Sequence, residues 1–171
     1  MGSDTEGSRS VLVASPAGPL EVVEQGGALV AAHFVAPADG SPARGRGGSA
    51  VLVEAQRQFR EYFVGTRREF DLPVRPAGTD FQRRVWDVLA TVPWGTTTTY
   101  GAIAARLGLS PGASRAVGAA NGANPIAIVI PCHRVIGSDG RLTGYAGGLE
   151  RKALLLHLEG VVARPQQRAL F

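Results

Sequence analysis

The spacing of apolar positions differs between the two halves of the chain. In the first half, three short β-prone runs occupy Val11–Ala14, Leu20–Glu24 and Ala28–Val35. Proline and glycine separate these runs, in residues 16–19 and 26–27. Short apolar runs bounded by such turn residues are typical of strands linked by hairpins. We therefore expect a small sheet in the first half.

One helix is expected beside this sheet, from Ser49 to about Gly65. Its helical spacing sets four side chains on related faces: Val53, Gln56, Phe59 and Phe63. Residues 1–10 are polar and glycine-rich, which is typical of a disordered terminus. Residues 66–78 contain two prolines and indicate a linker. The pattern predicts a small N-terminal α/β domain with its linker over residues 11–78.

The second half has helical periodicity. Residues 79–82, Thr-Asp-Phe-Gln, form a capping box that opens a helix ending at Pro93. Thr99 can cap a second helix that stops at Gly108. Ser110 and Pro111 suit the N-cap and the first turn of a third helix, which runs to about residue 122. Two short helices joined by a tight turn indicate a helix-turn-helix, with the third helix in the recognition position.

A last helix is expected from about Gly148 through Leu158, with Gly160 as its stop signal. Together these elements predict an α/β (α+β) fold. A small N-terminal α/β domain would be followed by a mostly helical, helix-turn-helix (winged-helix-like) C-terminal domain over residues 79–171.

Composition narrows the class of protein. With 44% hydrophobic and 19% charged residues, the chain has the balance of a soluble globular protein. No apolar run approaches the ~20 residues of a membrane span, and the start lacks the features of a signal peptide. One cysteine excludes an internal disulfide and a multi-cysteine metal site. We expect a cytoplasmic protein that binds neither a metal nor a membrane.

The charge is distributed unevenly. Residues 1–78 contain 8 arginines and 9 acidic residues, a net charge of −1. Residues 79–171 contain 9 arginines, 1 lysine and 5 acidic residues, a net charge of +5. A basic half attracts phosphates, but the same charge also suits a solvated face without a partner. Charge alone leaves both interpretations open.

The most informative stretch surrounds the only cysteine, Cys132. The apolar run Ile126–Ile130 predicts a short buried extended segment that ends at Pro131. A lone cysteine is commonly a small buried apolar residue. Here His133 and Arg134 follow it, and positive neighbours lower the pKa of a thiol toward the reactive thiolate. These neighbours favour a nucleophile, with a turn at Pro131 or a water needed to join Cys132 to His133.

The sequence Pro-Cys-His-Arg-Val at 131–135, preceded by Asn124-Pro125, resembles the active-site signature of the O6-alkylguanine-DNA alkyltransferases, also called methylated-DNA–protein-cysteine methyltransferases. The similarity runs from about residue 78 to 159 and includes residues 115–118 and 144–148. It implies DNA repair by direct damage reversal, through irreversible and stoichiometric transfer of a methyl or other alkyl group from O6-alkylguanine to the protein cysteine. Activity on O4-alkylthymine stays open, and no cofactor is needed because the damaged DNA is the alkyl donor.

The resemblance also implies residue roles. Cys132 would be the nucleophile, His133 its water-mediated base, and Glu159 the carboxylate that orients the histidine. Tyr100 would donate a proton to the departing guanine, and Asn124 would brace the turn before the active-site segment. Without the resemblance, Glu159 is an ordinary helix-end acid and Tyr100 an amphipathic core tyrosine.

The third helix would bind DNA. Arg115 lies where the family places an intercalating finger, which holds the space left by a flipped-out nucleotide; a phosphate contact is the alternative. Ser114, Ala116, Gly118 and Ala119 are too small to read base edges, which favours minor-groove binding with little sequence preference. The same small residues also suit a helix packed closely against another helix.

The glycine-rich loop near residue 145 would form the pocket that holds the flipped base. We expect Val135, Tyr145, Ala146 and Gly147 to line it. The expected partner is double-stranded DNA containing O6-alkylguanine, bound through the minor groove. We expect a monomer in solution, and cooperative binding along DNA stays open.

Three rival interpretations remain. A non-catalytic sensor of alkylated bases would replace the nucleophilic cysteine, so Cys132 argues against it. A helix-turn-helix regulator would need longer polar side chains on its recognition helix. A cysteine hydrolase would need a base in direct reach of the thiol and an oxyanion hole, which the adjacent His133 fits poorly.

Overall fold

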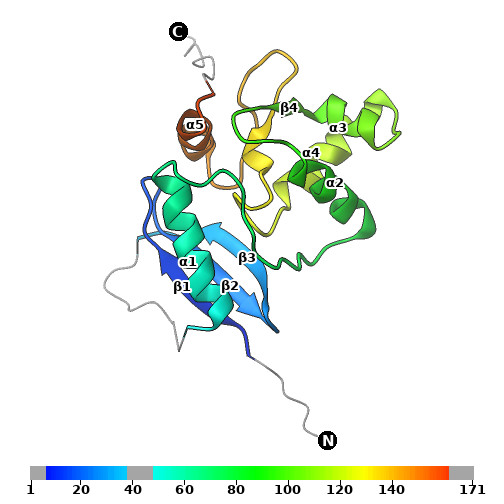
Figure 1. The fold of residues 1–171 in the computed structure, drawn as a ribbon. Coiled ribbons are helices and arrows are strands. Elements are labelled where there is room, and N and C mark those ends of the chain that lie inside the picture. The colour runs from blue at the N-terminus through cyan, green and yellow to red at the C-terminus, as the bar shows by residue number, and fades with distance from the viewer. Residues whose placement is uncertain (1–6, 38–47, 162–171) are drawn as a thin grey trace, which may run out of the picture. The chain divides into compact units, whose positions relative to one another are not determined.

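The computed structural model describes residues 7–37 and 48–161 (Figure 1). The chain forms two compact units. Unit 1 contains the described residues up to Ala77 together with Pro125–Ala127, and unit 2 contains Gly78–Asn124 and the described residues from Ile128 onward. Unit 1 holds the small sheet and unit 2 most of the helices, so the predicted α/β (α+β) fold class is confirmed.

The sheet of unit 1 is antiparallel, in the order β1-β2-β3. Its strands are β1 (Arg9–Val13), β2 (Leu20–Gln25) and β3 (Ala28–Phe34). Because β1 begins at Arg9, the predicted disordered terminus does not extend through residue 10; residues 1–6 lie outside the described residues. The backbone of Ala32 in β3 also hydrogen-bonds the carbonyl of Pro125 and the amide of Ala127, at 2.9 Å each. This pairing explains why three residues of the predicted C-terminal range group with unit 1.

Helix α1 (Ala50–Phe63) packs on β1 and β2 (Figure 1). Its N-cap is Ser49, whose side chain accepts a hydrogen bond from the Leu52 amide at 3.2 Å. The buried face comprises Leu52, Ala55, Gln58, Phe59, Tyr62 and Phe63. The expected place of Val53 on this face is wrong, since its side chain is 58% exposed. Neighbouring Leu52 takes the core position because the face follows a slightly different helical phase.

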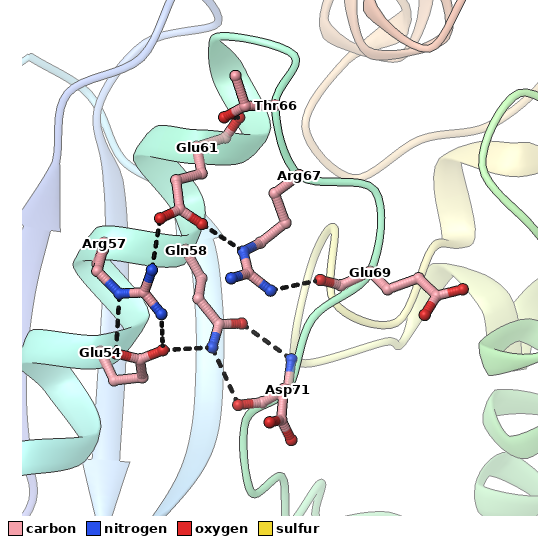
Figure 2. Close-up of polar contacts among 8 residues, drawn as sticks. All are labelled: Glu54, Arg57, Gln58, Glu61, Thr66, Arg67, Glu69 and Asp71. Atoms are coloured by element: carbon pink, nitrogen blue, oxygen red, sulfur yellow. Dashed lines mark hydrogen bonds and ion pairs between the residues drawn. The ribbon is translucent and has the colours of Figure 1, made fainter.

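A polar network holds the segment after α1 against the helix (Figure 2). The carboxylate of Glu61 accepts hydrogen bonds from Arg57 at 2.5 Å and from Arg67 at 2.6 Å. Arg57 also pairs with Glu54, one turn earlier. The Gln58 side chain bonds the backbone of Asp71 twice, to its carbonyl at 3.0 Å and from its amide at 2.9 Å. We call Glu54, Arg57, Glu61 and Arg67 the exposed network.

Unit 2 contains the predicted helices. They are α2 (Asp80–Ala90), α3 (Tyr100–Arg106), α4 (Ser114–Gly122) and α5 (Leu149–Leu158). The capping box that opens α2 is present, with both Thr79 and Gln82 bonding the backbone. Helices α2, α3 and α4 contact one another, as a helix-turn-helix requires (Figure 1). Strands β4 (Thr98–Thr99) and β5 (Val135–Ile136) form a parallel pair.

The start of the third helix differs from the expectation. Residues Pro111–Ala113 form a 3-10 turn, η1, and α4 begins only at Ser114. Ser110 makes no side-chain cap hydrogen bond. A 3-10 turn is common at the start of a helix. Ser110 is the N-cap of this turn and Pro111 lies in its first turn, as expected, and only the side-chain cap hydrogen bond is absent.

Gly78, the first residue of unit 2, has no room for a side chain. A Cβ atom there would lie 2.6 Å from Cζ3 of Trp86 and 2.8 Å from Oε1 of Gln82. Neither neighbour moves freely, because the buried Trp86 indole donates to the Ala120 carbonyl at 2.8 Å and Gln82 completes the capping box. The start of unit 2 therefore requires glycine.

Among the described residues, no helix has the length and apolar content needed to cross a membrane.

Candidate active site

The segment before the cysteine is buried but not extended. Ile126, Ile128 and Ile130 are buried, which matches the alternation expected of a strand. However, residues 128–129 form a turn, and Ile128 has a φ of 73°. A β-branched residue rarely adopts this left-handed conformation, which costs about 1–3 kcal/mol. The predicted extended segment is therefore wrong at Ile128, where burial in the core offsets the backbone strain.

Cys132 lies at the start of a 3-10 turn, η2 (Cys132–Arg134), directly after Pro131. The chain thus turns at Pro131, one of the two ways expected to relate Cys132 and His133. Cys132 is only 7% exposed, and His133 is fully buried. Because the two residues share a turn, their side chains are not forced to opposite faces as they would be on a strand.

Glu159 joins this turn to the end of α5. Its Oε1 lies 2.7 Å from Nε2 of His133, and both side chains are fully buried. Arg134 donates to both oxygens of the same carboxylate, from Nε at 2.8 Å and from Nη2 at 2.9 Å. Arg134 also donates to the Val92 carbonyl at 2.6 Å. We call His133, Arg134 and Glu159 the buried network.

The electrostatics of the buried network decide the protonation of His133. Burial alone raises the pKa of Glu159, but hydrogen bonds from His133 and Arg134 outweigh it and lower the pKa to about 2. Burial lowers the pKa of His133, and the bond to Glu159 offsets this only in part. An ionised carboxylate can only accept, so a neutral His133 must carry its proton on Nε2. Its Nδ1, which has no partner among the described residues, is then a bare acceptor able to take a proton.

The thiol itself differs from the expectation. Burial raises the pKa of Cys132, while a hydrogen bond from Asn124 and the charge of Lys152 act in the opposite direction. The expected lowering by His133 and Arg134 is wrong, because His133 is neutral and Arg134 turns to Glu159. Asn124 also donates to the Ile130 carbonyl at 2.7 Å, so it spans the turn before the cysteine.

A separate group of side chains lines a cavity of about 520 Å³ in unit 2. Six residues named from the sequence line it: Tyr100, Ser114, Arg115, Gly118, Tyr145 and Ala146. The other lining residues are Gly122, Thr143 and Gly144. Burial raises the pKa of Tyr145, and charge on Cys132 acts in the same direction. The cavity is large enough for a nucleobase and has the mixed lining of a small-molecule site.

The remaining residues named from the sequence do not line the cavity. Val135 is fully buried in β5, and Gly147 accepts a hydrogen bond from Arg151 at 3.1 Å. Ala116 and Ala119 are exposed on α4. Arg115, also exposed, has no hydrogen-bond or ion-pair partner among the described residues, so its guanidinium is available to a ligand.

Two buried polar residues were missed by the sequence reasoning. Asn121 donates weakly to the Cys132 carbonyl at 3.4 Å, and its Oδ1 has no partner among the described residues. Lys152 is fully buried in α5 and donates from Nζ to the Thr143 carbonyl at 2.6 Å. The sequence did indicate that Lys152 could be buried, because it lies on the same helical face as the buried residues Leu155 and Glu159.

No cluster that could hold a metal ion occurs in residues 7–37 and 48–161, where no three His, Cys, Asp or Glu side chains gather suitably.

Comparisons with known proteins agree with this geometry. Residues 9–76 match the family model described as 6-O-methylguanine DNA methyltransferase, ribonuclease-like domain, and residues 80–161 match the DNA binding domain of the same family. The chain therefore belongs to the 6-O-methylguanine DNA methyltransferase family, as the resemblance indicated.

Curated relatives carry the corresponding name. The methylated-DNA–protein-cysteine methyltransferase of Mycobacterium tuberculosis is 47% identical over 146 residues, covering 85% of this chain and 88% of the relative. The protein of that name from Methanosarcina acetivorans is 57% identical over 107 residues, covering 63% of this chain and 68% of the relative.

Solved structures share the fold. The crystal structure of the M. tuberculosis O6-methylguanine methyltransferase has a TM-score of 0.79 at 42% identity, covering 94% of this chain and 97% of that one. A structure of the M. tuberculosis protein in complex with DNA has a TM-score of 0.77 at 46% identity, covering 89% and 91%.

Proposed function

We propose that this protein repairs DNA by transferring a methyl or other alkyl group from O6 of guanine to the sulfur of Cys132. One observation carries the proposal: an ionised Glu159 fixes the tautomer of His133, the residue directly after the unique cysteine. The names of the relatives, methylated-DNA–protein-cysteine methyltransferases, support the same activity. The protein is thus a single-use transferase.

The reaction balances without a cofactor. Through a water, Nδ1 of His133 takes the thiol proton of Cys132, which generates the thiolate only when it is needed. The sulfur forms a bond to the alkyl carbon as the bond between that carbon and O6 breaks. The electron pair stays on O6 of guanine. Guanine takes up one proton, equivalent to the one that His133 removed from the thiol, and is restored in the DNA as the neutral base. A thioether remains on the protein, and since it has no leaving group, the protein reacts once.

Burial of the thiol suits this sequence of events. A thiol whose pKa is raised by burial is protonated before substrate binds, and is protected from other electrophiles. The hydrogen bond from Asn124 and the positive charge of Lys152 favour the thiolate, because both act to lower the pKa of Cys132. Tyr100, at the edge of the cavity, donates a proton toward the ring of the departing guanine.

DNA is the partner, and we propose that unit 2 makes every contact with its bases. The exposed small residues of α4 suit approach to the minor groove, and Arg115 takes the place of the flipped-out nucleotide. Residues 11–78 then form a supporting domain, and residues 79–171 the DNA-binding and transfer domain. The protein acts in the cytoplasm as a monomer, and its sequence-independent contacts allow several copies to bind one duplex.

The test is the intact mass of the protein after reaction with duplex DNA containing O6-methylguanine. We expect a gain of one methyl group in place of one hydrogen, located on Cys132, with one equivalent of guanine restored. Cys132→Ser should bind the same DNA and transfer nothing, because a serine hydroxyl is far less ionised than a thiol. An unmodified wild-type protein that still binds the lesion would instead indicate a sensor, and repair of many equivalents a true catalyst.

A further inference from the structure

The edge of the cavity contains a hydrogen-bond arrangement that the reaction above leaves unexplained. The Tyr100 hydroxyl donates to the Thr143 carbonyl at 3.2 Å, and the Thr143 hydroxyl donates back to the Tyr100 oxygen at 3.2 Å. One residue thus contacts Tyr100 twice, once through its backbone and once through its side chain. Both residues line the cavity.

Lys152 holds the same carbonyl from inside the protein. Its Nζ donates to the Thr143 carbonyl at 2.6 Å and is 3.5 Å from the Gly144 carbonyl. Lys152 is fully buried and forms no ion pair with any described residue, and burial lowers its pKa to about 8. A buried cation without a carboxylate is costly, so backbone carbonyls that hold it must be well fixed.

The direction of the single proton on the Tyr100 hydroxyl depends on the partners of its oxygen. A phenol has one proton to donate and a tyrosine oxygen can also accept. Because the Thr143 hydroxyl donates to Tyr100, the oxygen of Tyr100 is already occupied as an acceptor, and its proton must point elsewhere. Without substrate the proton goes to the Thr143 carbonyl. When a base enters the cavity, Tyr100 can turn its proton to that base, because Lys152 still satisfies the carbonyl.

The geometry favours such a change of partner. Both oxygen–oxygen distances, at 3.2 Å, exceed the roughly 2.5–3.0 Å of a strong hydroxyl hydrogen bond. The Lys152 bond at 2.6 Å is short by comparison. Tyr100 is therefore the loosely held donor on this carbonyl, and Lys152 the firmly held one. A hydroxyl that donates to a phenol oxygen also polarises the phenol and makes it a better donor.

We propose that Thr143 is a positioning residue for Tyr100: its hydroxyl directs the Tyr100 proton into the cavity and strengthens it as a donor to the departing guanine. The inference rests on the proposed function, since it gives Thr143 a role only if Tyr100 assists the leaving base. Thr143 does not touch the reacting atoms and acts through Tyr100 alone.

The test measures the single-turnover rate constant for methyl transfer from duplex DNA at saturating protein. Thr143→Val keeps the shape of the side chain and removes the hydroxyl, and we expect transfer to slow about five- to tenfold, the effect of losing one hydrogen bond. Thr143→Ser keeps the hydroxyl and should stay within about twofold of the wild type. Thr143→Ala serves as a second hydroxyl-free variant should the valine disturb the loop.

A double-mutant comparison separates positioning from a structural effect. In a Tyr100→Phe background, adding Thr143→Val should cause no further slowing, because the group that Thr143 directs is gone. A full further slowing in that background would overturn the inference, as would a serine variant as slow as the valine variant, or a valine variant as fast as the wild type.

The same measurements distinguish this inference from the proposed function. If Tyr100→Phe transferred methyl at the wild-type rate, the role of Tyr100 and the inference would both fall, while methylation of Cys132 would stand. If the wild-type protein methylated nothing, the proposed function itself would fail.

Discussion

Glu61 of unit 1 and Glu159 of unit 2 are each bonded by two basic side chains, but they differ in contact with water. The Glu61 side chain is 31% exposed, and that of its partner Arg57 is 54% exposed. The Glu159 side chain is fully buried, and that of Arg134 is 8% exposed. A hydrogen bond from Arg67 lowers the pKa of Glu61, and the bonds from His133 and Arg134 lower that of Glu159 despite its burial.

The difference in exposure gives the two networks different roles. Water and salt screen the exposed network, and either partner can be solvated if the other is removed. In the buried network neither partner has that alternative, so loss of one leaves a charge in the interior. The exposed network fastens a surface segment to α1, whereas the buried network fixes the protonation and position of His133. Charged pairs with similar hydrogen-bond distances therefore respond differently to mutation when their exposure differs.

The largest effect should follow Glu159→Gln, which keeps the size of the side chain and removes its charge. Arg134 would then be left as an uncompensated buried cation, and we expect a loss of about 3–5 kcal/mol in the free energy of unfolding of unit 2. Urea titration followed by tryptophan fluorescence checks this, because both tryptophans of the chain, Trp86 and Trp94, belong to unit 2. A loss below 1 kcal/mol would show that the two networks are equivalent.

Lowering the pH should show how much the ionised Glu159 stabilises unit 2, without a mutation. The pKa of Glu159 is about 2 in the folded protein against a reference of 4.5, so its contribution of about 3 kcal/mol is present above pH 4.5 and lost as the pH falls toward 2. The lowered pKa of His133 acts in the same direction and begins to reduce stability below pH 6.5. We expect the fluorescence transition of unit 2 to shift accordingly, and the portion below pH 4.5 to be absent from Glu159→Gln. A wild-type protein whose stability is unchanged between pH 6.5 and 3 would contradict this.

Arg134→Lys keeps the positive charge and removes the planar guanidinium group, so it tests the hydrogen-bond geometry of the buried network separately from its charge. Lysine cannot donate to both oxygens of Glu159 and to the Val92 carbonyl in the same geometry. We expect a loss of about 1.5–3 kcal/mol, the value of a hydrogen bond to a charged group, in the same urea titration. The matched control is Arg57→Lys in the exposed network. Because unit 1 contains no tryptophan, urea unfolding of both variants is also followed by circular dichroism, and Arg57→Lys should leave the midpoint almost unchanged. Equal effects at the two positions would argue against the distinction.

The smallest effect should follow Glu61→Gln in the exposed network. The neighbouring arginines remain solvated, so the midpoint of thermal unfolding followed by circular dichroism should shift only slightly. The shift should become smaller in 1 M salt, where the Debye length falls to about 3 Å and the attraction between exposed charges is largely screened. A large shift that persists at high salt would mean that the segment after α1 depends on this carboxylate for folding.

Local features of the fold were readable from the sequence. The three strands and the capping box of α2 depend on neighbours within a few residues. The spacing of Thr79 and Gln82 was therefore enough to predict the capping box. The turn at Pro131 is also a local feature, because proline restricts its own backbone. Where several local options were compatible, as for the helical phase at Val53, the sequence favoured the wrong one.

Burial and long-range pairing were not readable in this way. Nothing near Arg134 in the chain indicates that it pairs with Glu159, 25 residues later. The direction of the thiol pKa was wrong for the same reason, since positive neighbours in sequence need not face the sulfur. The left-handed conformation of Ile128 is likewise imposed by packing that no local preference indicates. The family resemblance supplied the His133–Glu159 pair, but not the arginine that shares it.

Gly78 bears on how the two units could be recombined. Because a side chain there would strike Trp86 and Gln82, the first residue of unit 2 cannot be treated as a neutral joining point in a chimaera. A fusion that replaces unit 1 by a homologous or unrelated domain must carry the glycine with unit 2, and any cloning scar must end at Ala77. The same restriction would apply to natural gene fusion, which would succeed only at crossover points that keep this glycine ahead of Thr79.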